Sequence, residues 1–199
     1  MRHLEIADIA KLLSDGSLSA ESCRHFAEVC PVCGERLAEV EALMKRFRHW
    51  DAETVVREGP PAADLLDALL GAGEDLEAWT SLVQQEDAEF QTWGVAWVAL
   101  ERAQSLIAED ATRGQARNLA LLAATIAAHL GASYNLDSIA DLKALAHATA
   151  AAAGPSGAAL DTLRQVAAAM AALDQGTGDP TVAEDVLSLL AQIFRKATE

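Results

Sequence analysis

Apolar side chains recur along this chain every three or four residues, the spacing that places them on one face of a helix. A first helix is predicted over 3–14, and Ser19 suits the N-cap of a short second helix reaching about Val29. Pro31 fits the first turn of a third helix that extends to about Trp50. Because no segment alternates with the two-residue period of a strand, the pattern predicts an all-α protein.

Residues 51–89 are predicted to form a helical connector. The sequence EGPP at 58–61 predicts a break, since glycine and proline both disfavour the interior of a helix. Short helices are expected on either side of a second glycine-rich break, over about 62–70 and 75–87.

Residues 90–199 are predicted to form an array of helical hairpins. Helix starts near Trp93, Leu136 and Asp179 are spaced 43 residues apart, longer than the about 34 residues of a tetratricopeptide repeat. Asp179 and Pro180 fit an N-cap followed by proline at the first helical position. The pattern therefore predicts tetratricopeptide-like repeats, with helices at about 91–109, 113–130, 137–153, 157–174 and 180–197.

The charge distribution argues against direct binding of nucleic acid. The chain carries a net charge of −15, and residues 51–89 alone hold 11 acidic residues against one basic residue, Arg57. Such a surface repels phosphate backbones and suits a basic protein partner, although acidity also serves solubility alone.

No membrane association is expected from the sequence. No window offers 18 uninterrupted apolar residues, and Glu5 and Asp8 interrupt the first apolar stretch, which lacks the features of a secretory signal. We therefore expect a cytoplasmic protein.

All three cysteines lie within residues 23–33, which indicates a metal site in the first 50 residues. Cys30 and Cys33 form a C-x-x-C pair, and two thiolates at that spacing can hold one tetrahedral ion. His25 lies five residues earlier, and a hairpin of the first two helices brings His3 beside it. The expected set is one structural Zn²⁺ bound by His3, His25, Cys30 and Cys33.

Two alternatives to this ligand set stay open. Cys23 can replace His3 as the fourth ligand, because residues near a terminus fray. The C-x-x-C pair can also be a redox pair or two small core residues, although redox pairs favour a βαβ setting that this chain lacks.

The remaining histidines and the tryptophans indicate structural roles, and no enzymatic activity is expected. The chain contains no H-E-x-x-H, no G-x-S-x-G and no glycine-rich phosphate loop. His49, His129 and His147 are scattered among predicted helices. Trp93 and Trp97 lie one helical turn apart, where we expect a core seam, with a binding surface as the alternative.

The first 50 residues resemble the zinc-associated anti-sigma domain. The histidines at positions 3 and 25, the turn LSDGSLSAES between them, the knuckle H-x4-C-x2-C and the following LAEVEAL helix carry the likeness. The stretches EFQTWG…LERA at 89–103 and GTGDP at 176–180 resemble bacterial regulators that join this module to degenerate tetratricopeptide-like repeats.

The resemblance implies a cytoplasmic regulator that binds an RNA polymerase sigma factor. The third helix is the expected contact surface, through Leu37, Val40, Met44 and Phe47. The alternative is a protein-interaction adaptor, in which the zinc is only a structural cross-link and the repeat surface carries the function.

Overall fold

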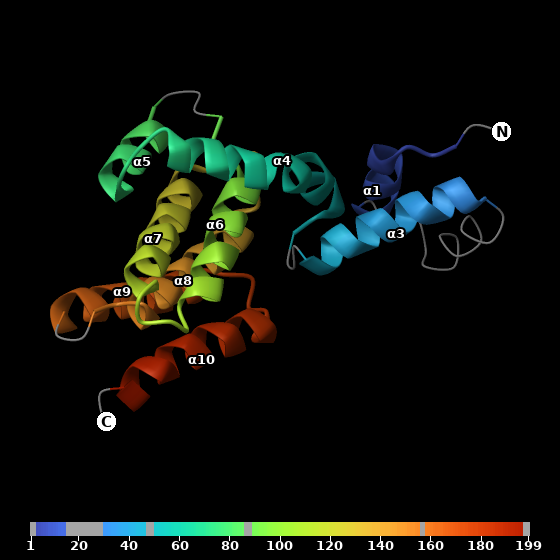
Figure 1. Ribbon diagram of the computed structural model, residues 1–199. Coiled ribbons are helices and arrows are strands. Elements are labelled where there is room, and N and C mark those ends of the chain that lie inside the picture. Colours follow the sequence, from blue (N-terminus) through green and yellow to red (C-terminus); the bar gives the residue numbers. More distant parts are fainter. Residues whose placement is uncertain (1–2, 15–29, 47–49, 86–88, 156–157, 197–199) are drawn as a thin grey trace. The chain divides into compact units, whose positions relative to one another are not determined.

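The protein is built from α-helices, as the sequence pattern predicts (Figure 1). The computed structural model describes residues 3–14, 30–46, 50–85, 89–155 and 158–196, and these contain no strand. The helices of the described residues are α1 (Ile6–Ser14), α3 (Pro31–Arg46), α4 (Ala52–Gly71), α5 (Leu76–Val83), α6 (Trp93–Leu106), α7 (Arg113–His129), α8 (Leu136–Ala152), α9 (Ala159–Leu173) and α10 (Pro180–Lys196).

The predicted helix boundaries hold well where the described residues test them. The five helices after residue 90 lie within three residues of their expected bounds, and α3 begins at Pro31 as expected. The first helix begins later than predicted, at Ile6, because Asp8 accepts a hydrogen bond from the Glu5 backbone N–H and closes the first turn. The predicted second helix, from Ser19 to Val29, lies outside the described residues.

The chain divides into two compact units, residues 1–61 and residues 62–199. The boundary lies inside the segment that the sequence marks as a connector. α4 contributes its first half to the first unit and its second half to the second.

The predicted break at 58–61 is wrong, because α4 continues through Pro60 and Pro61. A proline inside a helix removes one backbone hydrogen bond and crowds the carbonyl four residues earlier, at a cost of about 3 kcal/mol. Buried side chains flank the two prolines, with Val55 on one side and Leu66 on the other, each fully inaccessible to solvent. Their burial maintains the helix, and the boundary between the units falls directly after Pro61.

The first unit has a small core between α1 and α3. Ile9 from α1 packs with Leu37 and Val40 from α3, and all three side chains are buried. Side chains that are partly buried extend this cluster, namely Leu4, Ile6, Leu13, Met44 and Val56. The apolar stripes predicted for the first and third helices therefore face each other.

The second unit is organised around α8, which packs against α6, α7, α9 and α10. Thirteen of its residues are buried, seven of them alanines. Alanine has no side chain beyond Cβ, so it lets neighbouring helix backbones approach closely. The packing is that of a helical bundle or repeat array, in agreement with the predicted fold class.

Side-chain caps define several helix starts in the second unit. Asp75 accepts from the Ala78 N–H at 2.9 Å, and Thr92 accepts from the Val95 N–H at 3.2 Å. The predicted Asp179-Pro180 start is confirmed, since the Asp179 carboxylate accepts from the Thr181 N–H at 2.8 Å and α10 begins at Pro180.

A buried carboxylate connects α8 to the loop before α10. Asp141 is 3% exposed and accepts hydrogen bonds from the backbone N–H and the hydroxyl of Thr177. Gly176 precedes that threonine, and a Cβ there would collide with Asp141 Oδ1. The GTGDP loop therefore needs glycine at 176 because the carboxylate lies against its backbone.

Trp93 and Trp97 pack against each other, and His129 and His147 have hydrogen-bond partners, as expected for structural residues. Trp93 is fully buried, and its ring centroid lies 6.0 Å from that of Trp97 in a tilted arrangement. His129 Nδ1 lies 2.8 Å from the Thr125 carbonyl oxygen, and His147 Nδ1 lies 2.8 Å from Gln165 Oε1.

Replacing Leu122 by alanine should destabilise the second unit by about 2–5 kcal/mol, because this fully buried α7 side chain would leave a cavity. The matched change Leu163→Ala, at a position 64% exposed, should stay within about 0.5 kcal/mol. Urea unfolding followed by far-ultraviolet circular dichroism measures both. Equal effects of the two changes would contradict the described packing.

Replacing Gly176 by alanine should cost about 1–3 kcal/mol, since the added methyl group displaces the Asp141 carboxylate. Gly131→Ala is the control, because a Cβ at that position meets nothing within 4 Å. Thermal unfolding should show a lower Tm for the first variant alone. A Gly176→Ala protein as stable as the control would exclude the close approach.

Candidate metal centre

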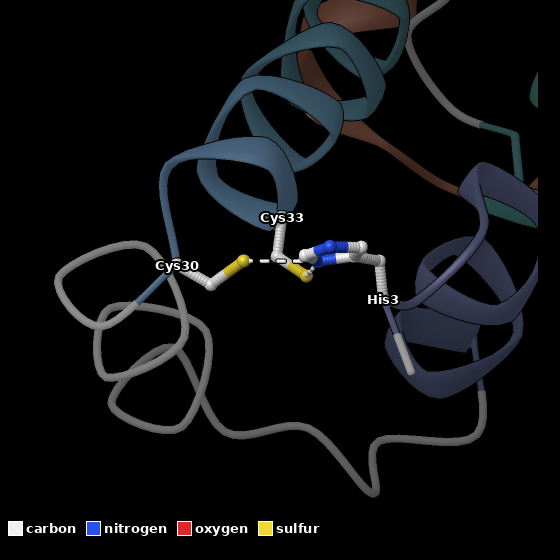
Figure 2. Close-up of side chains that lie close together, drawn as sticks. All are labelled: His3, Cys30 and Cys33. Carbon is white, nitrogen blue, oxygen red and sulfur yellow. Dashed lines mark hydrogen bonds between the residues drawn. The ribbon is translucent and has the colours of Figure 1, made fainter. Parts of the chain in front are cut away.

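Three side chains with metal-binding chemistry converge in the first unit (Figure 2). His3 Nδ1 lies 3.1 Å from Cys30 Sγ and 3.9 Å from Cys33 Sγ. The three donor atoms all lie within 4.8 Å of one another. The structure thus brings together three of the four predicted ligands, from positions 27 and 30 residues apart in the chain.

The start of α3 presents both thiols from one turn. Cys30 immediately precedes the helix, and its carbonyl accepts the Gly34 N–H at 3.0 Å, which closes the first turn. Cys33 lies within that turn and is buried, whereas Cys30 is partly exposed. A helix start carries free N–H groups and a positive dipole end, both of which favour a thiolate.

The local hydrogen bonds also act on the acidity of Cys30. The pKa of the Cys30 thiol lies below its ordinary value, mainly because of a hydrogen bond from the Cys33 backbone N–H. Smaller contributions come from the Cys33 side chain, the Val32 backbone and the positive charge of Arg36. Cys30 is therefore prepared to act as a thiolate, the form that binds metal.

His3 lies in a segment that Arg36 fixes against α3. Arg36 Nη1 donates a hydrogen bond to the Leu4 carbonyl oxygen at 2.6 Å. The same nitrogen lies 3.3 Å from Glu5 Oε1. Arg36 comes one turn after Cys33, so the arginine that holds the histidine-bearing segment belongs to the helix that carries the thiols. His3 itself precedes α1 by three residues, rather than opening the first helix as predicted.

The donor set and its dimensions fit a tetrahedral ion. A tetrahedral zinc ion with Zn–S of about 2.3 Å and Zn–N of about 2.0 Å separates nitrogen and sulfur ligands by about 3.5 Å and two sulfurs by about 3.8 Å. The His3 distances to the two sulfurs, 3.1 and 3.9 Å, bracket the first value. The three donor atoms lie within 4.8 Å of one another, so the group can hold a metal ion.

His25 as a ligand stays a prediction, because it lies outside the described residues. Cys23, the alternative to His3, and the partner residue Phe47 also lie outside them.

The other predicted partner residues lie in the core of the first unit. Leu37 and Val40 are 8% and 0% exposed in the contact between α3 and α1, and Met44 is partly buried beside them. The exposed face of α3 instead presents charged side chains, among them Glu39, Glu41 and Lys45.

Arg36 is the residue of this site that the sequence pattern did not single out. Its role depends on where the N-terminal segment crosses α3, which no local pattern encodes. A weak signal exists, since Arg36 lies three residues after Cys33 and therefore on the same face of the helix.

Comparison with protein-family models, with curated proteins and with solved structures finds no match for this chain. What the fold and the site define is an all-helical protein with a His/Cys/Cys group suited to a metal ion. None of the helices among the described residues is long and apolar enough to span a membrane.

Protein purified without chelator should contain one zinc per chain, and Cys30→Ser or Cys33→Ser should lose it, because each change removes a thiolate. His147→Ala is the control, since that histidine pairs with Gln165 in the second unit. Metal analysis by mass spectrometry measures the occupancy. Less than about half an equivalent of zinc in the unaltered protein would contradict the site.

The same measurement decides the remaining ligands. Only substitution of a true ligand should reduce zinc retention under a competing chelator, so His3→Ala, His25→Ala and Cys23→Ala are compared directly.

Proposed function

We propose that this chain is a non-enzymatic transcription regulator of the anti-sigma type. Its N-terminal module binds one structural Zn²⁺ and an RNA polymerase sigma factor, and its helical repeats contact another protein. The proposal rests on the resemblance of the first 50 residues to the zinc-associated anti-sigma domain. The convergence of His3 with Cys30 and Cys33 supports the metal-binding part of the proposal. The turn sequence LSDGSLSAES adds to that support.

A structural role for the zinc follows from the size of the module. Among the described residues, the cluster between α1 and α3 is formed by the buried side chains of Ile9, Leu37 and Val40, with partly buried side chains around them. A core that small stabilises a fold weakly, and a metal that joins the N-terminal segment to α3 supplies the missing free energy. The alternative of a catalytic zinc has less support, since the chain contains no H-E-x-x-H motif.

The burial of Leu37 and Val40 against α1 determines how a sigma factor binds the module in this proposal. A sigma factor that contacts this face of α3 replaces α1 on it, so binding and opening of the module are coupled. Met44 lies at the edge of the same cluster and is partly accessible, so it offers the first point of contact. Exposed acids of the connector, such as Asp64, Glu74 and Asp75, add electrostatic steering toward a basic partner.

The adaptor function is the second candidate, and one observation favours it. Leu160 and Leu163 on α9 are 65% and 64% exposed, and Met170 on the same helix is 44% exposed. Apolar side chains that gather on one helix face are typical of protein-interaction surfaces. In this alternative, the second unit holds the partner and the zinc only stabilises the first.

Met44→Ala should weaken a sigma-factor complex by about 1–2 kcal/mol, seen mainly as roughly tenfold faster dissociation, because it removes apolar contact area. Lys45→Ala is the matched control on the exposed face of α3 and should leave dissociation unchanged. Surface binding kinetics against each sigma factor of the same genome measures both rates.

The outcome separates the two functions. Failure of every sigma factor to bind below about 10 μM, a free energy near −7 kcal/mol, removes the anti-sigma proposal. A captured partner whose binding is abolished by Leu163→Asp and unaffected by Met44→Ala establishes the adaptor.

A further inference from the structure

The second unit contains a cavity of about 500 Å³ at the start of α7. That volume lies in the range of small-molecule sites in proteins. The cavity belongs wholly to residues 62–199 and is separate from the metal centre. Its lining combines cationic, amide and apolar groups, namely Asp110, Arg113, Gly114, Arg117, Asn118, Ala153 and Pro155.

Two arginines line this cavity from consecutive turns of α7. Arg113 pairs with Asp110 through Nη2, and Arg117 pairs with Asp161 of α9 through Nη2, each at 2.5 Å. These ion pairs fix both guanidinium groups, whose side chains are 22% and 24% exposed. Both Nε atoms are buried and make no hydrogen bond with any described residue.

Buried donors without acceptors are costly, and a guanidinium has five N–H groups in a planar fork. Each arginine contributes one nitrogen to its aspartate, so further donors on each remain for a ligand. An anion suits the remaining guanidinium donors, because a carboxylate or phosphate accepts two N–H bonds from one guanidinium side by side.

The start of α7 adds a second source of positive potential. Thr112 occupies the N-cap position but makes no capping bond, since its hydroxyl donates to the carbonyls of Leu106 and Glu109 instead. Gly114 follows in the first turn, and a Cβ there would meet nothing within 4 Å. The positive end of the α7 dipole therefore opens into the cavity without a side chain across it.

The second unit is strongly acidic, so two arginines beside one cavity are an exception to its overall charge. Residues 62–199 carry 7 basic and 19 acidic side chains, a net charge of −12. Two of those seven basic residues nevertheless line one cavity, where Asp110 lies beside them and each guanidinium is paired with an aspartate. Free anions are repelled by such a surface, so an anion is retained here only where donors are arranged for it.

The geometry points to a binding site for a small molecule with two negative charges, carried by a phosphate group or by paired carboxylates. Arg113 and Arg117 bind the charges, and the first turn of α7 with Asn118 orients the ligand. The site goes beyond the proposed regulatory function and does not depend on the zinc module. Occupancy would brace α7 against α9, since Arg117 already joins the two helices.

The test is a titration of the full-length, zinc-loaded, ¹⁵N-labelled protein with inorganic phosphate at constant ionic strength, followed by nuclear magnetic resonance. A second arm uses succinate, and sodium chloride is the control for unspecific screening. We expect saturable shifts of the Arg113 and Arg117 Nε–H signals and of the Gly114 amide, with a midpoint near or below about 1 mM. Saturation by phosphate alone assigns a phosphate ligand, and saturation by succinate alone assigns a dicarboxylate.

Substitutions in and outside the cavity test whether the anion binds there. Arg117→Gln should weaken binding at least tenfold, whereas Arg164→Gln, at an exposed arginine of α9 outside the cavity, should leave it unchanged. Gly114→Asp should abolish binding with the fold intact, because the space is open and a carboxylate at a helix start is favourable. Absence of saturation by either anion, or equal binding by Gly114→Asp and the unaltered protein, would overturn the proposal.

Discussion

The close approach of helices around α8 is the constraint on which the second unit depends. Four other helices pack on this one element, and thirteen of its residues are buried. A helix enclosed on so many sides cannot carry large side chains at every contact, so alanine dominates it. The few larger or polar groups that it buries, such as Leu142 and Asp141, then set the positions of particular neighbours.

Asp141 shows how a buried polar group contributes to a defined arrangement. A carboxylate buried without partners costs several kcal/mol, so its hydrogen bonds from Thr177 are needed for the fold. Those bonds fix the loop before α10, and α10 in turn covers α8. The ion pair between Arg117 and Asp161 acts in the same way between α7 and α9.

The first unit is organised by a different kind of contact. Its apolar core is small among the described residues, and two sets of polar contacts join the N-terminal segment to α3: those of Arg36 with Leu4 and Glu5, and the His3 group with the two cysteines. Both connections come from the first two turns of α3 or the residue before it. A metal ion at this point would join them into a single cross-link at the start of α3.

The sequence by itself predicted most of the helices that the structure describes, and three of the candidate ligands. The apolar spacing of three and four residues and the Asp179-Pro180 cap predicted helices of the second unit. Pro31 marked the start of α3. These signals succeed because they act within one or two helical turns. The C-x-x-C spacing likewise indicated the two thiols. Tertiary structure decided what depends on distant segments. In the first unit, Arg36 holds the His3 segment, and Leu37 and Val40 face α1. At the boundary between the units, α4 continues through Pro60 and Pro61, and in the second unit two arginines line a cavity. Local patterns cannot encode these features, because each depends on burial or pairing between residues far apart in the chain.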